Sequence, residues 1–328
     1  MRRFEYATPK TRKEAVSLLA AEWGDTEVIA GGTDLVGAMK DDAITPRRVV
    51  SLKRVAGLQG ISFRSGGELR IGSMTTLRQL MNDGHVKQHY PALFEAIEEI
   101  RSEQLRNMAT VGGALLQRPR GWYFRLGYGL LAQQDGRSMV EEGDNRYHAI
   151  LGNSGPAKFV SPSTLAPVLI ALNARVELDG PRGTRQIPLE RLYTTPTEPS
   201  EREHTLHPNE ILTEVAVPHA ATSHSGMYEI RQKEEIDWPL TTAAVVLEMD
   251  GQTVRRARVV LGHVAPIPWL SPEAAHAIEG KTVTEQTADA AGMAAVSNAT
   301  PLSMNRYKVQ LTRVAVKRAI LKAVHGGA

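Results

Sequence analysis

The pattern of apolar and polar positions divides the first part of the chain into short helices and strands. Residues 14–23, EAVSLLAAEW, have helical spacing behind the capping pattern Thr11-x-x-Glu14, and Gly24 is placed to end this helix. A strand is expected at 26–30, a helix at 34–40 and another strand at 47–52. Together these elements predict a compact α/β unit that ends near residue 56.

The periodicity changes after this unit. Two short strands are expected at 60–63 and 68–73 around the turn Ser65-Gly66-Gly67, then helices at 76–82 and 91–100. Regular structure returns with a helix at 163–173, with Ser163 as its expected N-cap, and a strand pair at 174–180 and 184–189. Between these parts, residues 118–160 lack a clear period. So long an irregular stretch usually serves a function or faces a partner.

The last third of the chain predicts a separate α+β domain beyond Pro218. Strands are expected at 226–232, 243–249 and 256–264, and helices from Ser271-Pro272, from the pattern Thr282-x-x-Glu285, and near 304–324. We therefore expect one domain over 1–218, made of a first lobe at 1–56 and a second lobe at 57–218, and another domain over 219–328.

Composition narrows the classes of function. The chain has 328 residues, of which 42% are hydrophobic and 23% charged, as in ordinary globular proteins of two or three packed units. No apolar run is long enough to cross a bilayer and no export signal is visible, so we expect a cytoplasmic protein without a membrane partner. The absence of cysteine excludes thiolate-held zinc, iron-sulfur ligation and a cysteine nucleophile. A net charge of only +3, with scattered basic residues, argues against a nucleic-acid partner.

Two glycine pairs carry the candidate chemistry. Gly31-Gly32 follows the strand expected at 26–30, and Gly112-Gly113 again follows an apolar stretch and precedes a helix-compatible run. Backbone amides at such turns attract anions, and two loops on neighbouring units could clamp a pyrophosphate. Neither loop has the Rossmann or P-loop pattern, and Gly-Gly pairs are also common as plain turns.

Longer segments around both pairs support a family assignment. VIAGGTDLVGAMK at 28–40 and LRNMATVGGALLQRPRGWYFR at 105–125 closely resemble the flavin subunits of the molybdenum hydroxylases, and the resemblance covers nearly the whole chain. It implies an α+β fold: a two-lobed FAD-binding domain of the vanillyl-alcohol-oxidase (PCMH) type, followed by a C-terminal domain of the carbon monoxide dehydrogenase flavoprotein type.

The resemblance also implies a set of FAD-binding residues. Ala30, Gly31, Gly32, Thr33 and Asp34 would wrap one side of the FAD pyrophosphate, with Asp34 capping the next helix or binding a ribose hydroxyl. Ala109, Thr110, Gly112 and Gly113 would wrap the other side. The expected set is completed by Val28, Ile29, Leu35, Leu116, Thr164 and Leu212.

The chain departs from the family at identifiable positions. Ala114 replaces a cofactor-binding asparagine, and Thr164 replaces an aspartate that would hold a ribityl hydroxyl. Each lost hydrogen bond costs on the order of 1 kcal/mol, so FAD binding should be weakened but not abolished. Gly121 and Ala157 stand where some relatives have iron-sulfur cysteines. The insertion 118–160 is then either a subunit contact that uses Trp122, Tyr123, Phe124 and Arg125, or a partly ordered surface loop.

The function implied by the resemblance is electron transfer through FAD. Such a subunit takes electrons from a two-cluster iron-sulfur small subunit, itself served by a molybdopterin-containing large subunit, and passes them to an acceptor that the sequence leaves open. No catalytic residue and no metal site are expected in this chain, and the pattern His204-x-x-His207 is set aside as a surface feature. Trp238 either covers the flavin ring or is partly buried packing.

Two other functions remain open. The chain could be a degenerate subunit that has lost FAD and acts as a scaffold, which the residues Ala114 and Thr164 would favour. It could instead be a stand-alone flavin oxidase.

Overall fold

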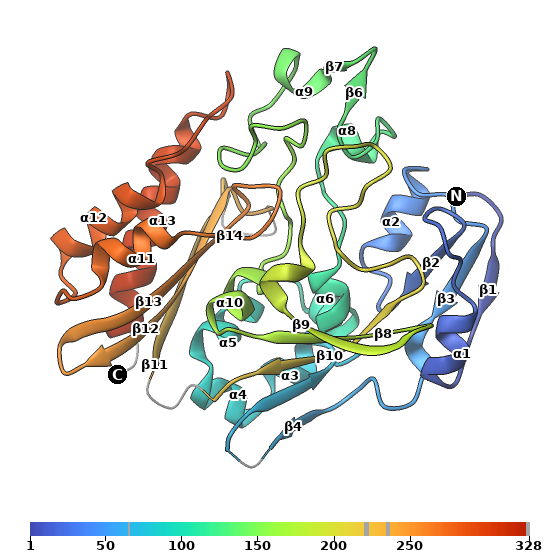
Figure 1. Cartoon of the computed structure of the whole chain (residues 1–328), viewed down its shortest axis with the longest axis horizontal. Helices are drawn as coiled ribbons and strands as arrows, with labels where there is room; N and C mark the ends of the chain where they lie inside the picture. Colours follow the sequence, from blue (N-terminus) through green and yellow to red (C-terminus); the bar gives the residue numbers. More distant parts are fainter. Residues whose placement is uncertain (65, 220–222, 234–236, 326–328) are drawn as a thin grey trace.

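The fold contains three larger sheets that follow one another along the sequence (Figure 1). The computed structural model describes residues 1–64, 66–219, 223–233 and 237–325. Ser65 of the expected turn at 65–67 lies outside these residues. A hairpin of β6 (Gln133–Gln134) and β7 (Arg137–Ser138) forms a fourth, two-stranded sheet in the insertion.

The first lobe is a small parallel sheet with two short helices. The strands β1 (Glu5–Ala7), β2 (Thr26–Ile29) and β3 (Arg48–Ser51) lie in the order β1-β3-β2, beside α1 (Arg12–Ser17) and α2 (Leu35–Lys40). The helix expected over 14–23 was too long, because α1 ends at Ser17. Beyond it the Ala20 amide donates to Thr26 Oγ1 at 2.9 Å, so the chain turns toward β2.

The second lobe is built on an antiparallel sheet with its core on the helical side. The strands β4 (Ile61–Phe63), β5 (Leu69–Gly72), β10 (Ile211–Val217), β8 (Arg175–Gly180) and β9 (Gly183–Pro188) lie in that order. The helices are α3 (Leu77–Met81), α4 (Gly84–His89), α5 (Pro91–Glu98), α6 (Glu103–Met108), α7 (Val111–Leu115) and α10 (Leu165–Ala171). Every side chain of α10 is buried, which fixes this helix in the main core.

The insertion 118–160 is largely irregular, as expected, but it is packed. Its elements are α8 (Trp122–Arg125), β6 (Gln133–Gln134), β7 (Arg137–Ser138) and α9 (Met139–Glu142). Phe124 is buried with Ala157 and Phe159 in a small apolar cluster, so the expectation that it serves as an interface residue was wrong. The fully buried Lys308 donates from Nζ to the carbonyls of Tyr147 and His148, which ties the insertion to the C-terminal unit.

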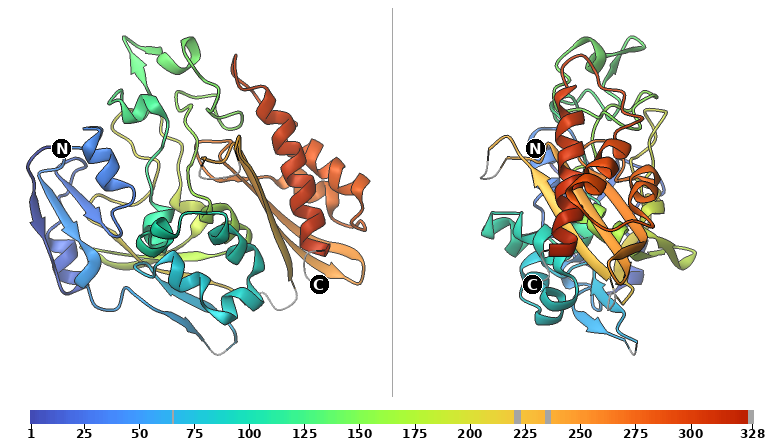
Figure 2. Two further views of the ribbon diagram at one scale, coloured as in Figure 1. Left: turned by 180° about the vertical axis from the view of Figure 1, so that it is seen from behind. Right: turned by 90° about the vertical axis from the view of Figure 1, so that its left-hand side faces the viewer.

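The C-terminal unit is an antiparallel sheet with three helices on one face (Figure 2). Its strands are β11 (Ser223–Ile230), β12 (Thr241–Asp250), β13 (Thr253–Gly262) and β14 (Trp269–Leu270), and its helices are α11 (Pro272–Ile278), α12 (Glu285–Ala295) and α13 (Tyr307–His325). The N-cap of α12 is Thr284, not the expected Thr282, because the Thr284 and Thr287 hydroxyls cap each other's amides. The opposite face of the sheet contributes Met227, Ala244 and Val260 to the core of the second lobe. Among the described helices, none has the length and apolar character needed to cross a membrane.

Candidate functional site

The two glycine loops cross each other at van der Waals distance. A Cβ atom added to Gly31 would lie 1.8 Å from the Met108 carbonyl oxygen, so only glycine lets the first loop pass α6. Gly32 adopts a φ of +79°, which an L side chain rarely takes. A Cβ atom on Gly113 would lie 3.9 Å from the Ala30 Cβ. The loops around residues 31 and 113 therefore form one joint between the two lobes.

Two clefts open on either side of this joint. The first encloses about 1140 Å³ of empty space and the second about 910 Å³, open solvent at each mouth included. Thr33, Asp34, Gly113 and Gln117 line both. The first cleft is also lined by Val28, Ala30, Gly31, Gly32, Leu35, Thr110, Gly112, Leu116 and Leu212, and the second by Ala109 and Thr164.

Ile29 is the one member of the expected set that lines neither cleft. Its Cδ1 atom would lie 3.4 Å from a Cβ placed on Gly32. The structure thus places Ile29 beneath the first glycine loop, where it supports the backbone, and not in a cleft wall.

The backbone amides of the two loops differ in what they bind. In the part of the chain that the structure describes, the amides of residues 31–35 have no acceptor. In the second loop the Val111 amide donates to the Thr75 carbonyl at 2.9 Å, the Gly112 amide to the Ser73 carbonyl at 2.8 Å, and the Gly113 amide to Thr110 Oγ1 at 3.1 Å. The amides of residues 111–113 are therefore already bound within the protein, whereas those of residues 31–35 are available to an anion.

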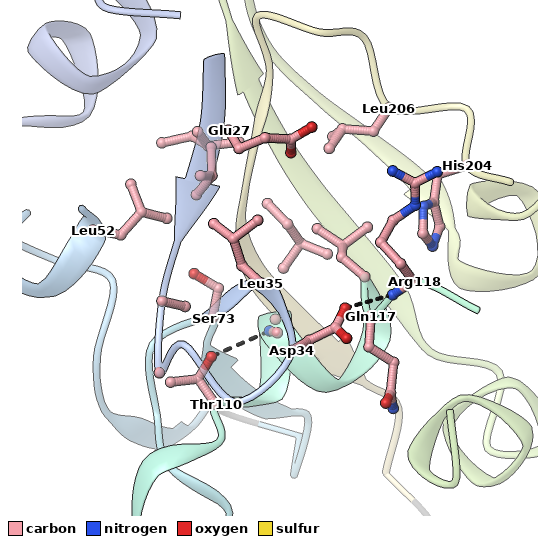
Figure 3. Close-up of a pocket in the computed structure, with 18 of the residues that line it drawn as sticks. Glu27, Asp34, Leu35, Leu52, Ser73, Thr110, Gln117, Arg118, His204 and Leu206 are labelled. Carbon is pink, nitrogen blue, oxygen red and sulfur yellow. Dashed lines mark hydrogen bonds between the residues drawn. The ribbon is translucent and has the colours of Figure 1, made fainter. Parts of the chain in front are cut away.

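Asp34 was expected either to cap α2 or to bind a ribose hydroxyl, and its side chain does not cap the helix. It stands at the N-cap position without a side-chain cap hydrogen bond. Its carboxylate pairs with Arg125 Nη2 at 2.6 Å and with Arg120 Nη2 at 3.1 Å. It also accepts from the Arg118 amide at 2.7 Å (Figure 3). One carboxylate thus faces two guanidinium groups, which leaves an excess positive charge where the clefts meet. Arg125, expected as an interface residue, is instead one of these two partners.

Charged and aromatic side chains close the far wall of the first cleft. Glu27 pairs with Arg202 at 2.9 Å, and the Arg202 guanidinium stacks 4.4 Å above the Trp23 ring. Burial raises the pKa of Glu27 to about 7, although Arg118 opposes this rise. Arg118 in turn pairs with the buried Glu203.

His204, set aside as a surface residue, lies in this wall. Its ring is 5.5 Å from that of Tyr193, and burial lowers the pKa of the imidazole, which therefore remains neutral at pH 7. The described residues contain no group of three or more His, Cys, Asp or Glu that could hold a metal ion. His204 is thus a lining residue that its spacing to His207 did not indicate.

The second cleft has few side-chain hydrogen-bonding groups near α10. Thr164 is only 7% exposed, and its hydroxyl has no partner among the residues described. The N-cap of α10 is Thr164, one residue after the expected Ser163, although Ser163 Oγ does accept from the Ala166 amide at 3.2 Å. Ala114 lines the same cleft with a methyl group. Trp238 stands at the cleft with 50% of its surface exposed.

Comparison with known proteins assigns this site to a family. Residues 2–220 match the family described as the FAD binding domain in molybdopterin dehydrogenase, which is more than half of the chain. The chain belongs to this family. Residues 226–323 of this FAD-binding chain further match the carbon monoxide dehydrogenase flavoprotein C-terminal domain.

Individual relatives of the FAD-binding chain align along its full length. It is 31% identical to the FAD-binding subunit of an aldehyde oxidoreductase from Escherichia coli, over 98% of this chain and 99% of the relative. It is 29% identical to the carbon monoxide dehydrogenase medium chain of Hydrogenophaga pseudoflava, over 97% and 96%. A solved structure of the Hydrogenophaga enzyme superposes with a TM-score of 0.78 at 27% identity, covering 100% of this chain and 99% of that one.

The cofactor of this family fits the residues present. The chain is a flavin subunit of an oxidoreductase, and its cofactor is FAD. Free amides at residues 31–35 and the positive charge around Asp34 suit a diphosphate, while the two clefts offer space on both sides of it.

Proposed function

We propose that FAD binds across the joint of the two glycine loops, with its diphosphate beside residues 31–35. The observation that supports this placement most directly is the run of amides in the first loop that have no acceptor in the described structure. The adenosine half would occupy the first cleft and the flavin half the second, where Thr164 has a free hydroxyl. The proposed contact set is the expected one without Ile29, with Arg118 and His204 added.

The protein residues act by binding and orientation. The Thr110 hydroxyl fixes the Gly113 amide, and Ser73 supports Gly112, so the second loop presents a rigid surface to the diphosphate. Asp34 holds Arg120 and Arg125 in place, which keeps their positive charge at the junction of the clefts. When bound, FAD supplies the redox chemistry. No side chain of this chain is required as a general acid or base.

We further propose the assembly in which the chain works. Its partners would be a molybdopterin-containing large subunit and an iron-sulfur small subunit that delivers electrons to this chain. The aldehyde oxidoreductase and carbon monoxide dehydrogenase relatives are by name an FAD-binding subunit and a medium chain, which supports a role within a larger complex. We place the division between its own two domains at 218/219, where β10 ends and the chain leaves the sheet of the second lobe.

Titration of the purified full-length chain with FAD tests the proposed site. We expect stoichiometric binding, seen as a shift of the flavin absorbance bands, and weaker binding when Gly32, at φ +79°, is replaced by alanine. Gly37→Ala is the matched control, because a Cβ there meets nothing within 4 Å. If the folded wild-type chain shows no flavin binding with excess FAD, the scaffold alternative is correct. If Gly32→Ala binds FAD as tightly as Gly37→Ala, the diphosphate lies elsewhere.

A further inference from the structure

Arg120 connects three parts of the chain at the second cleft. It lies in the insertion, and its Nη2 pairs with Asp34 of the first glycine loop at 3.1 Å. Its guanidinium carbon lies 4.7 Å from the centre of the Trp238 ring, in the connection between β11 and β12 of the C-terminal unit. Its Nε is buried and has no hydrogen-bond partner among the described residues. A single side chain thus spans the first lobe, the insertion and the C-terminal unit.

The contact with Asp34 restricts where the guanidinium can lie. The same carboxylate oxygen accepts from Arg125, and the other accepts from the Arg118 amide, so Asp34 is fixed from three sides. Side chains held by charged hydrogen bonds lose little further freedom when they stack on an aromatic face. Arg120 therefore offers Trp238 a preorganised surface.

Trp238 needs such support, because half of its surface is exposed. Arg120, Trp238 and Thr164 all line the second cleft. Two other arginines of this cleft, Arg101 and Arg231, pair with Glu99. The stacked pair of Arg120 and Trp238 is thus distinct from the arginines held by Glu99.

We propose that Arg120 is a positioning residue that holds the Trp238 indole over the flavin end of FAD. This inference rests on the placement of the flavin half in the second cleft proposed above. Arg120 acts through Trp238: its ion pair with Asp34 anchors it, and its cation–π contact orients the indole. The indole then shields the flavin from solvent and lies close enough to quench its fluorescence.

Flavin fluorescence of the purified full-length chain loaded with FAD tests this proposal. Stacked indoles quench flavin emission, so Trp238→Phe should increase the emission severalfold. Arg120→Met keeps the apolar stem but removes the cation. It should also raise the flavin emission, and it should make that emission more sensitive to quenching by added iodide. Loss of one cation–π contact should weaken FAD binding by about two- to fivefold. Arg120→Lys, which can still pair with Asp34, should give an intermediate emission.

Arg318→Met is the matched control, because Arg318 also stacks on an aromatic ring, that of Tyr228 at 5.0 Å, in the C-terminal unit. Its emission should equal that of the wild type. In the double variant of Arg120→Met and Trp238→Phe, the arginine change should add nothing to the emission, since both act on one indole.

The outcomes separate this inference from the proposed site. No FAD bound to the wild-type chain would overturn the proposed site itself. FAD bound with unchanged emission in Trp238→Phe would show that the indole does not cover the flavin. A rise in Trp238→Phe without one in Arg120→Met would remove the positioning role of Arg120.

Discussion

Replacement of Gly31 by alanine probes the crossing of the two loops most directly. The added Cβ would lie 1.8 Å from the Met108 carbonyl oxygen and 2.7 Å from its carbon. Both are backbone atoms, so the clash cannot be relieved by rotation of a side chain. The loops must move apart, and the joint that lies between the two clefts opens.

The expected cost follows from the atoms involved. Overpacking usually costs about 1–3 kcal/mol, and we expect the upper end because backbone must shift in two segments. Gly37→Ala is the control within α2: its Cβ would meet nothing within 4 Å, and alanine in a helix gains about 0.5–1 kcal/mol over glycine. The two substitutions add the same methyl group within one short stretch of sequence, yet they should change stability in opposite directions.

Denaturant unfolding without FAD is the decisive measurement. If Gly31 served only to let the backbone approach a diphosphate, the alanine variant would be as stable as the wild type in the absence of FAD and would differ only in affinity. The crossing predicts a loss of stability in the FAD-free protein and a further loss of FAD affinity. An FAD-free Gly31→Ala variant with wild-type stability would refute the reasoning.

Three further substitutions test other parts of the site and the insertion. Asp34→Asn leaves two half-buried guanidinium groups without a carboxylate and should lower the free energy of unfolding by about 1–3 kcal/mol. The control is Asp42→Asn: the exposed Asp42 carboxylate pairs with the N-terminus at 3.5 Å, and its loss should cost less than about 0.5 kcal/mol. Thr110→Val removes the acceptor of the Gly113 amide and should cost about 1 kcal/mol, while Thr110→Ser should retain most of the stability; equal losses would argue against the cap. Burial lowers the pKa of His148 to about 4, so the folded protein binds fewer protons than the unfolded chain between pH 6.5 and pH 4 and loses stability as the pH falls through this range. His148→Phe keeps a ring against Trp122 and Tyr123 but cannot be protonated. Relative to the wild type, its free energy of unfolding should rise by about 2 kcal/mol as the pH falls from 7 to 5; parallel curves of unfolding free energy against pH would contradict this.

The sequence predicted most of the longer strands and helices, where local patterns decide structure, but it missed β1 and β10, the central strand of the second lobe. The runs that form β3, β12 and β13 can be recognised from the sequence, because β-branched residues favour buried positions on a sheet. The helices α4 and α6 were missed because their apolar faces are short. Their caps were nevertheless visible in the sequence: Asp83 accepts from the Val86 amide, and Ser102 accepts from the Leu105 amide.

The sequence indicated which loops line the candidate site, but not which carbonyls and charged side chains bind the residues of those loops. Both glycine pairs have the same local pattern, yet only the first keeps its amides free, because the carbonyls of Ser73 and Thr75 bind those of the second. These acceptors come from the end of a strand that lies far away in the sequence. Arg118 and Arg120 stand on either side of Pro119 in the sequence, but their pairing with Glu203 and Asp34 depends on how the insertion folds back onto the first lobe.

The C-terminal sheet has apolar residues on both faces, and this limits how the chain can be divided. One face carries its own helices, while Met227, Ala244 and Val260 on the other complete the core of the second lobe. A fragment that stops after β10 would present that core to water, and one that begins at β11 would expose the matching strand surface. The two family matches meet between residues 220 and 226, but because the parts share a core we expect neither to be stable without the other.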